Sequence, residues 1–248
     1  MHFSLSAETI FHLGPIPITN SLISSVLVVA FLSGLAVWIG NNYRSLPSGL
    51  QHIFEMAYES FEDLAVSIMG ETGKKYVPLT VTFFLFIISA NWLSLLPGVG
   101  SIGFWEHLHG EKILVPFFRG ANADINTTLA LALTSVGASQ FYGIRTSGLL
   151  NHLKHFKNPL EIVSEVSKVL SFSFRLFGNV FAGEVLLLAA ASMLVLVTGK
   201  EAFLFGFPGG LIQIPFLMLE IFVGFIQAFI FSVLTLVFIS LYAGAKNH

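Results

Sequence analysis

Long apolar runs, separated by short polar stretches, dominate the chain. Residues 19–40, 76–97 and 124–145 carry almost no charge between their ends, and each is long enough to cross a hydrocarbon core of about 30 Å as a helix. Residues 159–198 and 209–243 are also mainly apolar, but at about 1.5 Å per residue they are too long for upright spans. They predict two long helices that are steeply tilted, bent or broken.

The stretch 47–70 has a different pattern. Apolar residues such as Ile53 and Phe61 recur at helical spacing, whereas Glu55 and Glu59 belong to the opposite, acidic face. This pattern predicts an amphipathic helix that is too charged to span and that lies at the membrane interface or against neighbouring helices. A site for another subunit is the alternative interpretation.

The N-terminal residues 1–18 contain Pro15 and Pro17, which prevent a regular helix, so a loop or interfacial segment is expected there. Glu8 precedes the first apolar run, and Arg44 is the first Lys or Arg of the chain. This is unlike a cleaved signal peptide, so the first predicted helix is expected to stay in the protein.

Composition supports a membrane protein, because 54% of the residues are hydrophobic and 10% are charged. We therefore predict one all-α polytopic membrane domain over residues 1–248, with about five transmembrane helices plus one amphipathic helix. The net charge of -2 provides no broad basic surface, so nucleic acid is not expected as a partner. The absence of Cys excludes disulfides, thiolate metal sites and Cys nucleophiles.

A cationic side chain, Arg175, lies in the middle of the apolar run 170–187, where exposure to lipid costs from about 3 to more than 10 kcal/mol. At about 100° per residue, six polar side chains of the predicted long helix share a strip about 120° wide. They are Glu161, Glu165, Lys168, Ser171, Arg175 and Asn179. Glu184 falls on the opposite side. The cost of burial predicts a functional Arg175, with an ion pair to Glu161 or to another helix as the structural alternative. Lys168 and Glu161 either neutralise each other or face a cytoplasmic outlet.

The last predicted helix carries a polar stripe, because Gln213, Glu220 and Gln227 recur every seven residues and share one face. Such a stripe is costly unless it faces protein or water. Glu184 on the preceding helix can meet Glu220, and two carboxylates in a poorly solvated site resist simultaneous ionisation. Such a pair can hold and pass a proton. Structural pairing of the two acids, and interhelical hydrogen bonding by Asn179 and the glutamines, are the alternatives.

Other polar residues have simpler interpretations. Asp124 fits the N-cap of the helix that follows it. Asn126 begins a glycosylation motif, but its place at the mouth of a membrane helix argues against its use. Asn91 is interpreted as an interhelical hydrogen bonder. His107 and His109 have flanking Glu residues, but no further ligands gather nearby, so neither a metal nor another cofactor is expected.

Three separated motifs resemble those of one family. The run Arg175-Leu176-Phe177-Gly178-Asn179, continuing through Ala182-Gly183-Glu184, resembles the signature of subunit a of the F-type ATP synthases. Asp124-Ile125-Asn126-Thr127-Thr128-Leu129 resembles the start of an earlier helix in that family, and Gln227-Ala228-Phe229-Ile230-Phe231 resembles its last helix. The motifs occur in the family's order and cover most of the chain. Relatives often carry His at one of the positions 184 and 220, whereas both are Glu here.

The resemblance implies a stator without ATP chemistry of its own, which passes protons, rather than sodium, to and from the carboxylates of a rotating c-ring. The two long helices are then strongly tilted against the ring, and Arg175 separates two offset half-channels. Proton translocation is assigned to Arg175, Glu184, Glu220, Gln227, Asn179 and Gln213. Candidate channel-lining residues are Asp124, Asn126, Glu161, Glu165, Lys168 and Ser171. The implied partners are the c-ring, the peripheral-stalk b subunits, the rest of the complex and the lipid bilayer.

Three other functional classes compete with this interpretation. A secondary transporter predicts paired, broken hydrophobic halves, which the sequence lacks. An intramembrane enzyme could use two carboxylates, but neither a protease signature nor a metal-binding set is present. A purely structural membrane subunit is the third. Basic residues favour a topology with the N-terminus outside and the C-terminus on the cytoplasmic or matrix side of an energy-transducing membrane, bacterial or mitochondrial.

Overall fold

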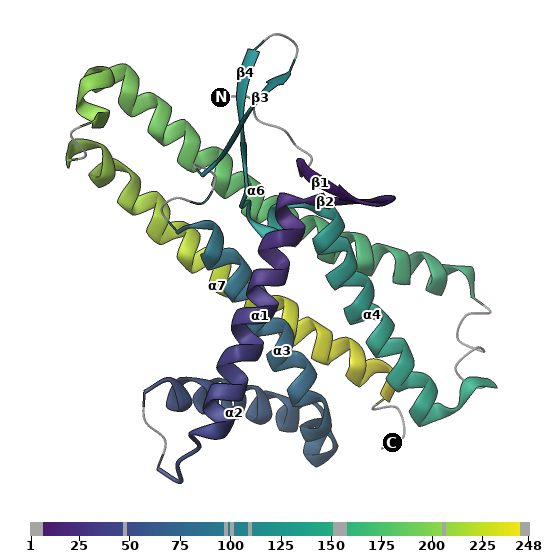
Figure 1. The fold of residues 1–248 in the computed structure, drawn as a ribbon. Helices are drawn as coiled ribbons and strands as arrows, with labels where there is room; N and C mark the ends of the chain where they lie inside the picture. The colour runs from purple at the N-terminus through teal and green to yellow at the C-terminus, as the bar shows by residue number, and fades with distance from the viewer. Residues whose placement is uncertain are drawn as a thin grey trace.

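The computed structural model describes residues 7–46, 49–96, 99, 102–108, 111–150, 158–204 and 207–243. Side-chain surroundings are described for all of these except 13, 16, 105–108, 111–114, 191–204 and 207–212. Long helices dominate (Figure 1): α1 Asn20–Asn41, α2 Leu50–Met69, α3 Val77–Ser94, α4 Ile125–Ser147, α6 Pro159–Leu204 and α7 Phe207–Ala243. Short 3-10 helices, η1 Gly70–Tyr76 and η2 Ala121–Ala123, precede α3 and α4. The predicted all-α polytopic class is confirmed.

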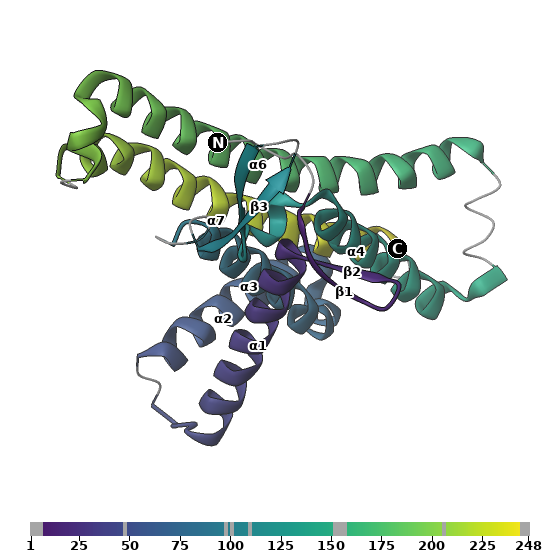
Figure 2. The same ribbon diagram turned by 45° about the horizontal axis from the view of Figure 1, so that its top comes forward.

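Helices α6 and α7 form a long hairpin that the other helices support from one side (Figure 2). Helix α7 packs against α3, α4 and α6, and α4 also packs against α6. Helix α1 packs mainly on α3 and η2, whereas α2 reaches α3 and α7. The result is a central group of four helices, with α1 and α2 at its edge.

Aromatic side chains fill the centre of this group. Phe172 of α6 lies 4.8 Å from Phe231 and 5.1 Å from Phe238 of α7, measured between ring centroids. Phe83 of α3 lies 5.5 Å from Phe231. Rings at these distances add to the gain from apolar burial and fix the rotation of each helix about its axis. Leu176 is fully buried beside them, so the neighbouring Arg175 is turned to the surface.

Four helical stretches are long and apolar enough to cross a membrane among the residues that the structure describes: Asn20–Asn41, Leu50–Ser94, Pro159–Ala190 and Gln213–Ala243. Helix α4, predicted as a further span over 124–145, has 23 residues but does not meet this measure of apolarity. Its inward face instead carries small polar groups. Ser135 Oγ is 2.7 Å from Thr235 Oγ1 of α7, and Thr128 Oγ1 is 3.1 Å from Ser173 Oγ of α6. Packing against α6 and α7 satisfies these hydroxyls.

Two β-hairpins occupy segments that the sequence patterns did not assign to regular structure. Strands β1 Thr9–Leu13 and β2 Ile16–Thr19 pair antiparallel within the expected N-terminal loop. Gly14 in the turn has φ of 63°, a conformation that glycine adopts without steric cost. Strands β3 Gly103–Leu108 and β4 Glu111–Pro116 form the second hairpin. Both hairpins lie at the end of the helix group opposite α2 (Figure 1).

Candidate functional site

Glu184 of α6 and Glu220 of α7 come together where the two long helices pack. The Glu220 carboxylate lies directly over the α6 backbone, since a Cβ built on Gly183 would be 2.2 Å from Glu220 Oε1. Glu184 directly follows Gly183, so both acids belong to the same part of the α6–α7 contact. The structure therefore joins two acids that are 36 residues apart in sequence, 220 minus 184, in one site.

A cation that the sequence analysis did not assign to the site, Arg119, faces one of these acids. Its Nε atom is 4.0 Å from Glu184 Oε2, and the two side chains are 11% and 20% exposed. Gly120 allows this approach, because a Cβ there would lie 2.9 Å from Glu184 Oε1 and 3.0 Å from the Ser94 side chain. The sequence feature that points to Arg119 is its position just before the polar start of the span predicted over 124–145.

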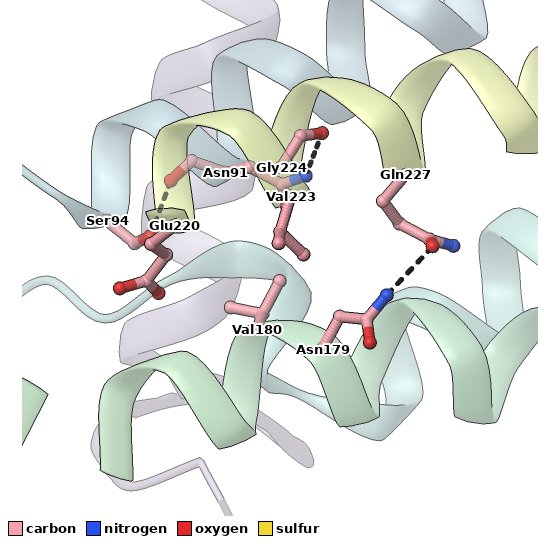
Figure 3. A pocket seen from close by; sticks show the side chains of 8 residues that line it. All are labelled: Asn91, Ser94, Asn179, Val180, Glu220, Val223, Gly224 and Gln227. Atoms are coloured by element: carbon pink, nitrogen blue, oxygen red, sulfur yellow. Dashed lines mark hydrogen bonds between the residues drawn. The ribbon is translucent and has the colours of Figure 1, made fainter. Parts of the chain in front are cut away.

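Glu220 is less well satisfied than Glu184. Its Oε2 atom is buried and, among the described residues, has no hydrogen-bond partner. Beside it is a small cavity of about 10 Å³, room for about one water molecule. Figure 3 shows the lining residues: Asn91, Ser94, Asn179, Val180, Glu220, Val223, Gly224 and Gln227. A buried carboxylate oxygen therefore lies next to a space the size of one water molecule.

Three of the lining residues, Asn91, Asn179 and Gln227, are amides. Asn91 Nδ2 donates to the Gly224 carbonyl at 3.1 Å, which confirms its predicted role as an interhelical hydrogen bonder. Asn122 Nδ2 donates to Asn91 Oδ1 at 2.7 Å. On the far side, Asn179 Nδ2 donates to Gln227 Oε1 at 2.9 Å (Figure 3). Gln227 is buried and Asn179 is exposed, so this bond connects the cavity to the surface of α6.

The Gln213 side chain is partly exposed on α7 and makes no side-chain hydrogen bond to another described residue. The structure thus gathers Glu184, Glu220, Gln227 and Asn179 in one region and leaves Gln213 outside their hydrogen-bonded network.

Arg175 lies on the exposed surface of α6. Its one described hydrogen bond goes to Ser171 Oγ, at 3.4 Å, and no carboxylate in the described part of the chain forms an ion pair with it. Exposed apolar side chains, such as Phe174 on α6 and Phe222 on α7, occupy the same hairpin. In a membrane such a cation needs an anion or water from beyond the described residues. The predicted alternative, an ion pair with Glu161 or with another helix, does not occur among the described residues.

A second polar cluster lies toward the N-terminal end of α6 and the C-terminal end of α7. Glu165 accepts hydrogen bonds from Lys168, from the Tyr242 hydroxyl and, at 2.7 Å, from Gln140 Nε2 of α4. Lys168 Nζ also donates to the Tyr242 hydroxyl at 3.0 Å. The Tyr242 hydroxyl has Glu161 Oε1, at 3.1 Å, as its alternative acceptor. The structure pairs Lys168 with Glu165, where the sequence analysis considered Glu161.

Asp124 caps α4, as predicted, because its side chain accepts from the Asn126 backbone N–H at 3.0 Å. It also accepts from Ser21 Oγ of α1 at 2.7 Å, and it is 6% exposed. Both Asp124 and Asn126 border an open groove of about 610 Å³ between α1 and α4, whose lining also includes Thr127 and Ser25. Asp124 therefore combines a capping role with a place on the wall of this groove.

The structure does not test the metal prediction for His107 and His109. His109 lies outside the described residues, and the surroundings of the His107 side chain are not described. No group of three or more His, Asp or Glu side chains in the described ranges is arranged to hold a metal ion.

Comparison with known proteins gives a consistent result over nearly the whole chain. A family model described as ATP synthase A chain matches residues 22–240. ATP synthase subunit a of Moorella thermoacetica is 31% identical over 93% of this chain and 94% of its own length. ATP synthase subunit a of Syntrophobacter fumaroxidans is 34% identical over 90% of this chain and 82% of its own length. The motifs around Arg175, Asp124 and Gln227 all lie inside the matched range.

Proposed function

Because this chain belongs to the ATP synthase A chain family and so serves as the proton-translocating membrane subunit of an ATP synthase, we propose that its α6–α7 hairpin separates two proton half-channels. The observation that carries this proposal is the setting of Arg175. It is an exposed cation without an ion pair in the described part of the chain, and it lies between two polar regions at different heights along α6.

The two regions are far enough apart to be offset. Glu184 follows Arg175 by nine residues, about 14 Å along the helix, and Glu161 precedes it by 14 residues, about 21 Å. The first region holds Glu220 and its cavity, and the second holds Tyr242. Arg175 stays charged at any relevant pH, so it is a fixed barrier and a poor proton relay. Carboxylates can relay protons, and each region supplies them.

In this mechanism a proton enters through Glu184, Glu220 and the cavity beside Gln227, and then neutralises a carboxylate on a rotating ring subunit. After rotation the carboxylate releases its proton toward the region of Glu161 and Tyr242. The ionised carboxylate is attracted to Arg175 before it is protonated again. Each proton that crosses the field releases about 2.3 kcal/mol per 100 mV.

The same reasoning proposes the partners and the orientation. The exposed apolar face of α6 and α7 around Arg175 faces the c-ring, and peripheral-stalk b subunits and lipid cover other helices. With the N-terminus outside, the Glu184 region opens to the outer side and the Glu161 region to the inner side. An energy-transducing membrane is the setting. The comparisons do not favour a self-contained transporter.

The test uses the assembled complex in sealed vesicles. We expect Arg175→Ala to abolish ATP-driven proton pumping with normal assembly, and to raise passive proton leak after removal of the catalytic head. Arg175→Lys is the matched control, since it keeps the charge but loses the guanidinium geometry. It should limit the leak more than Ala does. Normal pumping by Arg175→Ala would reject the proposal.

A further inference from the structure

Two cations lie seven residues apart on the same strip of α6, and the fold places them in opposite settings. Arg175 is exposed, and in the described part of the chain it makes no ion pair. Lys168 is held inward, with a side chain that is 17% exposed. Seven residues of helix separate them by about 10 Å. Within a membrane, where salt screens poorly, a ring carboxylate passing one cation would also be attracted to the other.

Lys168 contacts both α7 and the neighbouring turn of α6. Its ammonium group pairs with Glu165 and donates to the Tyr242 hydroxyl at 3.0 Å. It also lies 5.1 Å from the ring centroids of Phe238 and Tyr242, close enough for cation–π attraction. Gln140 of α4 holds the second Glu165 oxygen at 2.7 Å, so Glu165 cannot turn away from Lys168 without losing that bond.

We propose that Glu165 is a positioning residue that masks the charge of Lys168, so that Arg175 alone attracts the ring carboxylates. The proposal rests on the proposed function, because it assumes that a carboxylate passes this face of α6. It assigns Glu165 a role other than channel lining. Glu161 is then the acid of this region that is not paired with Lys168, and its Oε1 atom lies 3.1 Å from the Tyr242 hydroxyl.

The first experiment measures ATP-driven proton pumping per assembled complex for Glu165→Gln, Lys168→Gln and the double variant. Masking predicts that the two single variants differ. Glu165→Gln leaves the Lys168 charge unpaired and should reduce pumping by about threefold or more relative to Lys168→Gln. The double variant, which lacks both charges, should recover most of that loss. Equal losses in the two single variants, or no recovery in the double variant, would overturn the proposal.

Loss of a buried partner can also harm folding, so a second experiment adds the charge after assembly. The chain has no native Cys, which makes Lys168→Cys a specific chemical handle within it. Treatment with aminoethyl methanethiosulfonate restores a lysine-like cation, and the hydroxyethyl reagent adds a neutral group of similar size. The same complexes with Lys168→Gln control for reaction at other subunits.

In the Glu165→Gln/Lys168→Cys complex, the cationic reagent should reduce pumping by about threefold or more, and the neutral reagent should not. With Glu165 present, the cationic reagent should have little effect. Equal effects of both reagents, or of the cationic reagent with and without Glu165, would show that masking is wrong. Failure of the proposed function itself would appear separately, as normal pumping by Arg175→Ala.

Discussion

The two polar regions that join α6 to α7 differ in how completely their charges are satisfied. In the Glu165 cluster, the carboxylate has three hydrogen-bond donors, one of which is the paired cation Lys168. In the Glu184–Glu220 site, Arg119 is 4.0 Å from one acid, and the other has a buried oxygen with no partner among the described residues. A satisfied network holds helices together, whereas a buried carboxylate oxygen without a partner costs stability, which is why a functional role for Glu220 is proposed above.

The strongest test of this difference removes the acid Glu220 from one region and a hydrogen-bond donor, Gln140, from the other. Glu220→Gln keeps the shape of the side chain but cannot relay a proton, so we expect ATP-driven pumping to fall by about tenfold or more. Gln140→Leu at the Glu165 cluster removes one hydrogen bond and should leave most pumping intact. Both are measured as acidification of sealed vesicles, normalised to the amount of assembled complex. A larger loss for Gln140→Leu than for Glu220→Gln would reverse the assignment of the two regions.

A smaller effect is expected from moving the acid rather than removing it. A Cβ on Gly183 would lie 2.2 Å from Glu220 Oε1, so Gly183→Ala must push the carboxylate toward or across the cavity. We expect pumping to fall by a factor of about three to ten, because misplacing a relay by about 1 Å weakens proton transfer steeply.

Two comparisons check that displacement is the cause. Gly137→Ala on α4 is the matched control, since nothing lies within 4 Å of a Cβ built there. Combining Gly183→Ala with Glu220→Asp shortens the displaced side chain and should recover part of the pumping. If the shorter acid makes the defect worse, the steric explanation fails.

The features that the sequence predicted are those that depend on the spacing of apolar residues and on the cost of burying a charge. The apolar runs indicated the helices, the isolated charge marked Arg175, and the seven-residue repeat placed Glu220 and Gln227 on one face of α7. The family resemblance added the function, and the comparisons confirm the family. Arg119 and Tyr242 were missed because their contacts cross between elements, and no local spacing encodes such contacts. The hairpin at β1 was missed because two prolines within residues 15–17 obscured the strand pattern.

The contribution of Arg119 can be separated from that of the acids. Arg119→Ala leaves Glu184 without its nearby cation in a largely buried site, and we expect the subunit to lose about 1–3 kcal/mol of stability. Arg119→Lys keeps the charge and should lose less. Thermal unfolding of the detergent-solubilised complex, followed by loss of this subunit, gives the measurement. Equal stability of the Ala variant and the unaltered chain would mean that the 4.0 Å contact contributes no stability.

The smallest effect is expected outside both regions, at the contact between α1 and α4. Ser21 Oγ donates to Asp124 at 2.7 Å, but Asp124 keeps its capping bond to the Asn126 N–H without it. Ser21→Ala should therefore lower the free energy of unfolding by about 1 kcal/mol, because it removes a single hydrogen bond and Asp124 retains its other donors. Asp124→Ala loses the cap as well and should cost about twice as much.

Because neither residue contacts Arg175 or the Glu184–Glu220 site, pumping per assembled complex should follow assembly alone. If Ser21→Ala lowers pumping without lowering assembly, the groove between α1 and α4 belongs to the proton path. The comparison of the Glu165 cluster with the Glu184–Glu220 site would then have to include this groove as a third polar region.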